Sequence, residues 1–440
     1  LFVDDFIVSY QVCSHINTLL YFHKIITLPF NKTNKPMQIA IIGGAGTIGS
    51  TVAYSLSIMD PELEIFLVDI NQNSAEGHAL DLSYSSSHLC HPVGMPIHPT
   101  NSNIIKTLPL QSLHDLNPDL LIITASIPRP VDSSSKSSTK GWRLEFLKLN
   151  KPLITSIGAY LESMTPIPVI VVTNPLDRIT YHLWKSSNWP RKFFVGYSLS
   201  EQARMAYYIS QLKQVDSSDV YCPVLGEHGD HVVPIFSRAK VQNMPLEFSL
   251  KERQNLTEQV RDAAYEVIRL RGTEDSSRWV TGRGVSLLAL ALLSHDLSSP
   301  IPLSVPLEGE YGFNDVCLIV PVLFSNRNVT KIVEWDLSEE EKLELEEDPF
   351  KKTKQESSVE EFKTMEEEYR EKLKTHKKIL KDGKNIWIPI DSLIVSEDST
   401  IAKEPIIEVE TSINENLEES EMVTILDSLS FLDKAEDEEL

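Results

Sequence analysis

The stretch Gln38-Ile39-Ala40-Ile41-Ile42-Gly43-Gly44-Ala45-Gly46-Thr47-Ile48-Gly49 joins a short apolar run to a cluster of glycines. An apolar run of this length before glycines predicts a strand buried on both faces, and residues 50–59 continue as a helix. Similar apolar runs occupy residues 64–68, 120–124 and 169–173. Strands that alternate with helices form βαβ units, so the sequence predicts an α/β fold with an N-terminal doubly wound parallel sheet of the Rossmann type.

The glycines fit two spacings of a nucleotide-binding loop. Gly44, Gly46 and Gly49 match G-x-G-x-x-G, while Gly43, Gly46 and Gly49 stand three apart. Glycine is needed where a pyrophosphate must approach backbone amides and the start of a helix, although a bland glycine-rich turn is the alternative for the loop alone. Asp69 ends the next strand about twenty residues on, where a carboxylate accepts the ribose hydroxyls of NAD and repels the extra phosphate of NADP. The alternative for Asp69 is a plain turn residue.

The pattern changes along the rest of the chain. After about residue 184 it predicts a helix buried all round at 286–293 and antiparallel strands at 303–307, 316–323 and 331–335. We therefore expect an NAD-binding domain at 37–184 and an α+β substrate domain at 185–348. The segment 349–440 is expected to hold one amphipathic helix, from a capping box at Ser358 and Glu361 to Leu380, followed by a largely disordered acidic tail. Residues 1–36 are expected to be translated upstream sequence or a poorly ordered extension before Met37.

The formal charge of −22 disfavours nucleic acid and anionic membranes as partners. Salt adaptation of the surface is the alternative explanation of this excess. No run of about 18 apolar residues occurs, which disfavours a membrane span. The four cysteines have no metal-ligand or redox spacing, so we expect no metal site and a reducing compartment, the cytoplasm.

Several ordered motifs carry a resemblance. They are Thr-Ala-Ser-Ile-Pro-Arg at 124–129, Thr-Asn-Pro-Leu-Asp at 173–177, Glu-Gln-Ala-Arg at 201–204, Gly-Glu-His-Gly-Asp-His-Val-Val-Pro at 226–234, Leu-Glu-Gly-Glu-Tyr-Gly at 307–312 and Val-Glu-Trp-Asp-Leu at 333–337. With these motifs the chain resembles the lactate/malate dehydrogenase family from about residue 37 to about residue 345. The resemblance is greatest to the lactate-dehydrogenase-like malate dehydrogenases of archaea.

The resemblance implies a role for each matching residue. His228 would exchange a proton with the substrate's 2-hydroxyl while hydride passes to or from NAD, which suits imidazole because it titrates near neutral pH. Glu201 stands where the family has the aspartate that stabilises the histidine cation. Arg204 matches the arginine that binds the substrate carboxylate with its planar fork. Asn174 matches the asparagine between substrate and nicotinamide, and Asn150 matches an asparagine near the cofactor, with a plain helix-surface position as the alternative.

Arg129 decides the expected substrate. An arginine at this position resembles the malate enzymes, because oxaloacetate carries a second carboxylate, whereas pyruvate would leave the guanidinium facing a methyl group. The alternatives are a lactate or other 2-hydroxy-acid dehydrogenase, and a pseudoenzyme that kept only the fold. The resemblance also implies a homodimer or homotetramer.

Three departures from the family pattern concern the site. A long serine-rich stretch separates Arg129 from Arg143, to which the resemblance assigns the lid role of closing over the substrate and polarising its carbonyl. Glu201 is one methylene longer than the family's aspartate, and segment 195–201 is about one residue short. The threonine of the substrate wall is ambiguous between Thr273 and Thr281.

The acidic tail is predicted to be dispensable for chemistry, because no motif residue lies beyond residue 348 and the composition disfavours a packed core. Removal of residues 397–440 should leave the turnover number within about twofold. Loss of activity in a truncated chain that still folds would show that the tail takes part in the site or in assembly.

Overall fold

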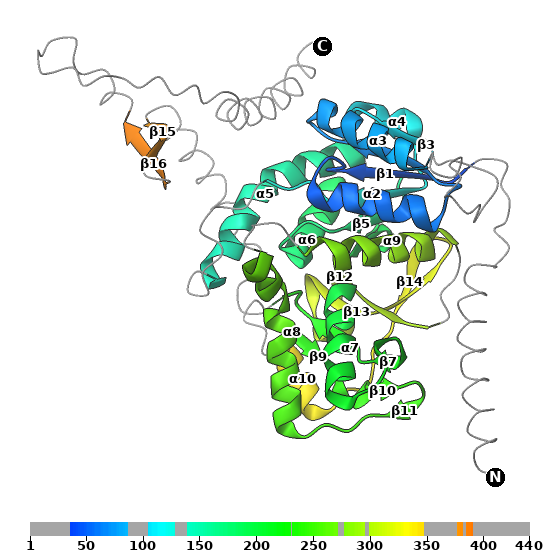
Figure 1. Ribbon diagram of the computed structural model, residues 1–440, viewed down its shortest axis with the longest axis vertical. Helices are drawn as coiled ribbons and strands as arrows, with labels where there is room; N and C mark the ends of the chain where they lie inside the picture. Colours follow the sequence, from blue (N-terminus) through cyan, green and yellow to red (C-terminus); the bar gives the residue numbers. More distant parts are fainter. Residues whose placement is uncertain are drawn as a thin grey trace, which may run out of the picture. The chain divides into compact units, whose positions relative to one another are not determined.

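Figure 1 shows the computed structural model, which describes residues 36–86, 104–127, 139–229, 231–271, 277–294, 299–346, 376–381 and 384–389. The chain divides after Lys342 into two compact units. The first unit contains the large sheet and all of the candidate site residues. The predicted extension at 1–36 lies almost entirely outside the described residues, and so does nearly all of the predicted tail.

Six parallel strands form the N-terminal part of the large sheet, in the order β3-β2-β1-β4-β5-β6. They are β1 (Gln38–Ile42), β2 (Glu64–Val68), β3 (Ile104–Thr107), β4 (Leu120–Ile123), β5 (Val169–Val171) and β6 (Phe194–Gly196). This confirms the predicted doubly wound parallel sheet. The order reverses between β1 and β4, which is where such sheets open a crevice for a ligand.

Alternate residues of these strands point to opposite faces, and both faces are buried. Ala40, Ile42, Leu121 and Ile123 belong to a core cluster with apolar residues of helices α5 (Thr139–Glu162) and α6 (Leu176–Ser187). Ile39, Ile41, Leu120 and Ile122 alternate with them and are equally inaccessible to solvent. Because both faces are covered, the strands are continuous apolar runs rather than alternating ones, which is why they stood out in the sequence.

The sheet continues without a break into the second half of the chain. Ser304 of β12 pairs with Gly196 of β6, and the order then runs β12-β13-β8-β9, with β14 beside β13. Strands β12, β13 and β14 pair antiparallel, as predicted, and β8 and β9 extend the same antiparallel arrangement. Their bounds are Ile301–Glu308 (β12), Asn314–Ser325 (β13), Asn328–Ile332 (β14), Val224–Gly226 (β8) and Val232–Pro234 (β9).

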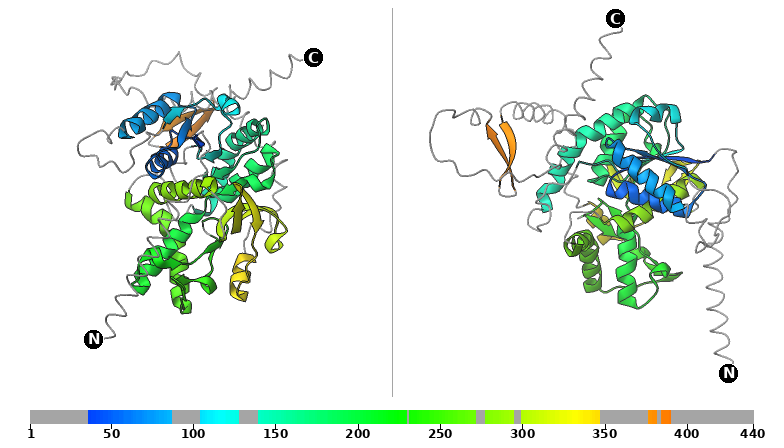
Figure 2. Two further views of the ribbon diagram at one scale, coloured as in Figure 1. Left: turned by 90° about the vertical axis from the view of Figure 1, so that its right-hand side faces the viewer. Right: turned by 45° about the horizontal axis from the view of Figure 1, so that its top comes forward.

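Helices surround both parts of the sheet. The remaining elements are α2 (Thr47–Met59), α3 (Gln72–Ser86), α4 (Leu113–Leu116), α7 (Leu199–Lys213), α8 (Leu250–Arg271), α9 (Arg278–Ser294), α10 (Glu339–Glu346), β7 (Val220–Tyr221), β10 (Lys240–Val241) and β11 (Met244–Pro245). Figures 1 and 2 show α2 and α9 side by side, and Ser286 of α9 donates a hydrogen bond to the carbonyl of Val52 in α2 at 3.3 Å. Helix α9 therefore joins the nucleotide half to the substrate half.

Three predicted elements differ from the structure. Helix α9 is not buried all round, because Leu287 is half exposed on one face. The strand expected at 331–335 instead covers Asn328–Ile332. The amphipathic helix expected to run to Leu380 is wrong over its last turn, because His376–Lys381 forms strand β15, paired antiparallel with β16 (Lys384–Pro389). The rest of that predicted helix lies outside the described residues. No helix in the described ranges is long and apolar enough to cross a membrane.

Candidate active site

A side chain would collide with the backbone at several positions of the glycine loop after β1, and Gly43 and Gly49 are the most crowded of them. Gly43 has φ +87°, and a Cβ there would lie 2.4 Å from the backbone nitrogen of Ala125. A Cβ on Gly49, in the first turn of α2, would lie 2.2 Å from the Gly43 carbonyl oxygen. Gly46 is the N-cap residue of α2 and has no side chain to cover the amides of the helix N-terminus. The loop therefore fits a pyrophosphate, which those amides and the helix dipole would hold.

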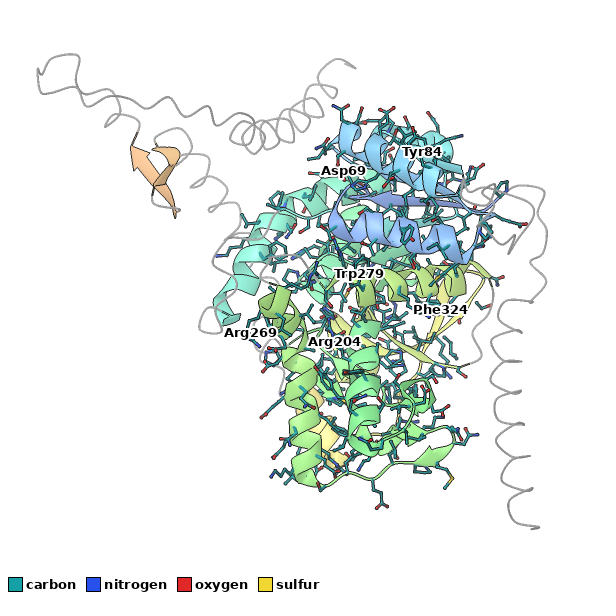
Figure 3. All side chains as sticks on the ribbon, in the orientation of Figure 1. Asp69, Tyr84, Arg204, Arg269, Trp279 and Phe324 are labelled. Atoms are coloured by element: carbon teal, nitrogen blue, oxygen red, sulfur yellow. The ribbon has the colours of Figure 1, made fainter. Side chains whose placement is uncertain are left out.

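Asp69 lies directly beside this loop, and Figure 3 marks its place. Its Oδ2 accepts a hydrogen bond from the backbone nitrogen of Ala45 at 2.9 Å, and its Oδ1 accepts one from the nitrogen of Asn71 at 3.0 Å. The second contact is the one a plain turn residue would make, while the first fixes the carboxylate against the glycine loop. Each oxygen keeps a further lone pair, so the half-buried carboxylate fits the hydroxyls of a ribose.

Asn150 lies inside the protein. Its side chain is fully buried, its Oδ1 accepts from the nitrogen of Ile127 at 2.8 Å, and its Nδ2 donates to the carbonyl of Phe146 at 3.0 Å. The alternative of a plain helix-surface position is therefore wrong. Asn150 anchors the segment that leaves β4 toward Arg129, and its role near the cofactor stays a prediction.

The structure describes the side chain of neither arginine that was predicted to contact the substrate from the long serine-rich stretch and its ends. Arg129 lies outside the described residues. Arg143 lies near the start of α5, and only its backbone is described. Thr173 connects the carboxyl ends of β4 and β5, because its hydroxyl donates to the carbonyl of Ala125 at 2.8 Å. The next residue, Asn174, is half-buried and lies two residues before the start of α6, at the same edge of the sheet as the glycine loop.

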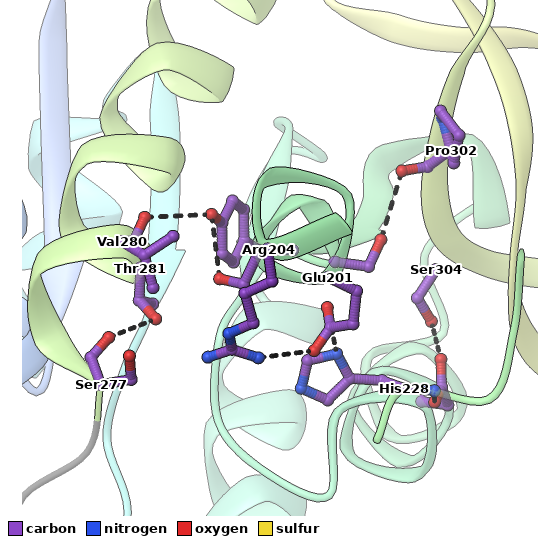
Figure 4. Close-up of polar contacts among 12 residues, drawn as sticks. Glu201, Arg204, His228, Ser277, Val280, Thr281, Pro302 and Ser304 are labelled. Carbon is purple, nitrogen blue, oxygen red and sulfur yellow. Dashed lines mark hydrogen bonds and ion pairs between the residues drawn. The ribbon is translucent and has the colours of Figure 1, made fainter. Parts of the chain in front are cut away.

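Three predicted residues meet at one buried carboxylate, as Figure 4 shows. Glu201 lies in the first turn of α7, Arg204 lies one turn further along, and His228 lies in the loop between β8 and β9. The Oε2 of Glu201 is 3.2 Å from Nδ1 of His228, and its Oε1 is 3.1 Å from Nη1 of Arg204. The Glu201 side chain is only 4% exposed. The structure thus brings together the three residues that were predicted to be the proton carrier, its carboxylate partner and the substrate arginine.

The charges in this group decide the ionisation of Glu201. Burial by itself would raise the pKa of the carboxyl, but the neighbouring His228 and Arg204 outweigh burial and lower the pKa to about 2. Glu201 is therefore ionised at neutral pH. The extra methylene relative to aspartate does not break the contact with the imidazole, and the same carboxylate also contacts Arg204.

The structure describes one of the two threonines that are candidates for the predicted substrate wall. Thr281 lies in the first turn of α9, and its hydroxyl donates to the carbonyl of Ser277 at 2.9 Å. The neighbouring carbonyl of Val280 accepts from the hydroxyl of Tyr197 at 3.3 Å, which ties α9 to the start of α7 (Figure 4). Burial raises the pKa of Tyr197 to about 12, so this hydroxyl stays a donor. Thr273 lies outside the described residues, and the choice between the two stays a prediction.

Sequence reasoning missed Asp177 as a site residue. Its buried carboxylate accepts a hydrogen bond from the backbone nitrogen of His228 at 2.7 Å and another from the hydroxyl of Ser304 at 2.6 Å. Asp177 stands inside one of the motifs that carry the resemblance, but its partners lie far away along the chain. Among the residues whose placement is described, no group of three or more potential ligands could hold a metal ion.

The ionisation of Glu201 predicts a pH-dependent stability. Its pKa in the folded protein is about 2, below the ordinary 4.5, so the ionised carboxylate stabilises the fold above about pH 4.5 and this contribution is lost as the pH falls toward 2. The shift corresponds to a contribution on the order of 3 kcal/mol. Urea unfolding should show the unaltered protein losing stability relative to Glu201→Gln between about pH 6 and about pH 3.

Glu252 provides a matched control. Its pKa is also lowered to about 2, chiefly by a hydrogen bond from Lys213 and further by Ser249, but this pair lies at the protein surface. Solvent and salt screen such a pair, so Glu252→Gln should change the pH dependence little in high salt. A stability difference for Glu201→Gln that stays constant over the same pH range would contradict the ionisation assigned to Glu201.

Comparison with known proteins agrees with this geometry. Residues 37–196 match the family model for the lactate/malate dehydrogenase NAD binding domain, and residues 201–362 match the model for the alpha/beta C-terminal domain. The chain is 31% identical over 309 residues to the malate dehydrogenase of Pyrobaculum aerophilum, covering 69% of this chain and 93% of that protein. It is 32% identical over 327 residues to L-lactate dehydrogenase 1 of Enterococcus faecalis, covering 71% and 91%.

Solved structures give the same result. The lactate dehydrogenase of Eimeria maxima with NADH and oxamate superimposes with a TM-score of 0.62 at 25% identity, covering 77% of this chain and 96% of that chain. The malate dehydrogenase of Aeropyrum pernix superimposes with a TM-score of 0.60 at 26% identity, covering 75% and 97%. With both halves matched in sequence and in fold, this chain belongs to the lactate/malate dehydrogenase family.

Proposed function

We propose that this member of the family is an NAD-dependent malate dehydrogenase, which interconverts malate and oxaloacetate. The observation that carries the proposal is the single buried carboxylate of Glu201, which contacts both the imidazole of His228 and the guanidinium of Arg204. A histidine with a fixed carboxylate partner is a general acid and base, and the neighbouring guanidinium provides a place for a substrate carboxylate. A protein that kept only the fold has no need of this buried charge cluster.

The proposed roles follow from the chemistry of these groups. In malate oxidation His228 accepts the proton of the 2-hydroxyl, and Glu201, ionised throughout, stabilises the imidazolium that results. Arg204 binds the carboxylate next to carbon 2, and Asn174 lies toward the nicotinamide side. Bound NAD supplies the hydride acceptor, and it would be held by Gly43, Gly46, Gly49 and Asp69. We assign to Arg143 the closing of the site over the substrate.

The choice between malate and lactate rests on Arg129, because the relatives include both malate and lactate dehydrogenases at similar identity. A guanidinium at the far end of the substrate pairs with the second carboxylate of oxaloacetate. With pyruvate the same group would be desolvated without a partner, at a cost of several kcal/mol. Lactate dehydrogenase is therefore the second candidate.

We further infer a homodimer or homotetramer in the cytoplasm. Cys222 and Cys317 are free and buried, as expected for a protein that needs no disulfide there. The oligomer is inferred from the family, and a sedimentation or light-scattering mass measures it directly.

The cofactor assignment predicts that NADH binds more tightly than NADPH. Asp69 would bond the ribose diol and repel a 2'-phosphate, so Asp69→Ala should narrow the ratio of the two dissociation constants, measured by cofactor fluorescence. Asp69→Asn is the matched control for the loop, because an amide oxygen can still accept from the Ala45 nitrogen while the negative charge is gone. Equal affinity of the unaltered protein for both cofactors would overturn the assignment.

The substrate assignment predicts that Arg129→Gln lowers kcat/KM for oxaloacetate. The corresponding loss of transition-state stabilisation is on the order of 3 to 5 kcal/mol. The variant loses one partner of a charge-assisted pair that strengthens as water leaves the closing site. Pyruvate should lose nothing, because it has no distal carboxylate. Initial rates of NADH oxidation with each keto acid give both values.

Arg204→Gln is the contrast, because both keto acids carry the carboxylate that Arg204 would bind, so both should be impaired together. If Arg129→Gln instead impairs oxaloacetate and pyruvate equally, Arg129 does not contact the distal group. The malate assignment would then give way to an unspecified 2-hydroxy acid.

A further inference from the structure

His228 is held from two sides by two buried carboxylates. Its imidazole Nδ1 lies 3.2 Å from Glu201, and its backbone nitrogen donates to Oδ2 of Asp177 at 2.7 Å. Asp177 is only 5% exposed, so its charge would be costly to bury without such donors. The side chain and the backbone of the same residue are thus fixed by carboxylates from two different helices, α7 and α6.

Asp177 is itself fixed by a second donor. The hydroxyl of Ser304, in the central strand β12, donates to its other oxygen at 2.6 Å. The next residue of the helix, Arg178, has its Nε 3.8 Å from Oε1 of Glu227, the residue before His228. Two consecutive residues of α6 therefore hold two consecutive residues of the histidine loop.

The histidine loop needs such support because glycines flank it. Gly226 has φ +90° and Gly229 has φ +113°, conformations that other residues rarely adopt. Glycines at both ends leave the peptide between them free to move unless other groups hold it. The hydrogen bond from the His228 nitrogen removes this freedom at the residue that carries the imidazole.

The position of Asp177 also ties the histidine loop to the substrate side. Helix α6 begins at Leu176, two residues after Asn174. The first turn of α6 therefore contains Asp177. It begins only two residues after the asparagine assigned to the substrate. The spacing between Asn174 and His228 is consequently set by a short, rigid piece of backbone rather than by two independent loops.

We propose that Asp177, supported by Ser304, is a positioning residue that sets the place of His228 relative to the substrate. This inference rests on the proposed function for its effect on catalysis, and on the hydrogen bond alone for its effect on the loop. Asp177 does not contact the reacting atoms in this account. It acts through the backbone of the residue that does.

The test compares three variants. Asp177→Ala removes both acceptors. Asp177→Asn keeps an oxygen for the His228 nitrogen, and its amide can donate to Ser304, whose hydroxyl turns to accept. Thr180→Val is the matched control, because Thr180 is a buried polar residue of the same helix whose hydroxyl donates to the carbonyl of Leu176, not to the histidine loop.

The first readout is the rate constant of a single turnover of bound NADH with oxaloacetate, which does not depend on the fraction of folded protein. Asp177→Ala should lower it on the order of 100-fold, the effect expected of a misplaced catalytic group. Asp177→Asn should have a rate constant within about tenfold of that of the unaltered protein, and Thr180→Val should have one within about twofold. NADH affinity should stay unchanged in all three.

The second readout is hydrogen exchange at the His228 amide, which needs no activity. The amide should lose its protection in Asp177→Ala and keep it in Asp177→Asn. Protection that survives in Asp177→Ala, or an Asp177→Asn variant as slow as the alanine variant, overturns the proposal. If the unaltered protein turns over neither oxaloacetate nor pyruvate, the proposed function fails, while the exchange data still decide whether Asp177 holds the loop.

Discussion

The site depends on one buried carboxylate that contacts both an imidazole and a guanidinium. Glu201 is almost fully buried, and burial alone would favour its neutral form. His228 and Arg204 reverse this preference, so the carboxyl of Glu201 is ionised. Removing Glu201 leaves Arg204 without this partner, and removing either neighbour weakens the stabilisation of a carboxylate that is almost fully buried. The chain must therefore bring the first turn of α7 and the loop after β8 to the same place.

The continuous sheet meets this requirement. Strand β6 leads directly into α7, while β8, β12 and β13 of the same sheet carry the histidine loop and Ser304. The parallel strands on the other side present the glycine loop, Asp69 and Asn174 at their carboxyl ends. Helix α6 then links the two groups, since it starts beside Asn174 and holds the His228 backbone through Asp177. The residues predicted to bind cofactor and substrate are thus positioned by one sheet.

The sequence patterns predicted the elements whose structure depends on residues close together along the chain. The strands at 38–42 and 64–68 were found because runs buried on both faces are apolar throughout. The helix predicted to run to Leu380 was wrong over its last residues, because a run as short as His376–Lys381 fits both the helical and the strand period. Its pairing with β16 makes it a strand. The motifs indicated that His228, Glu201 and Arg204 belong to one site, but they indicated neither the burial of Asn150 nor the hydrogen bonds of Asp177. Those depend on hydrogen bonds between residues that are distant along the chain, which no local spacing records.

The central claim is that His228, held by Glu201, carries the proton of the reaction. It is tested most directly by kcat/KM for oxaloacetate in the variant His228→Asn, measured together with the NADH dissociation constant. The account predicts a fall on the order of 100-fold to 10,000-fold, the range for loss of a general acid, with NADH binding unchanged. A variant that keeps kcat/KM within about threefold of the unaltered protein would contradict the account.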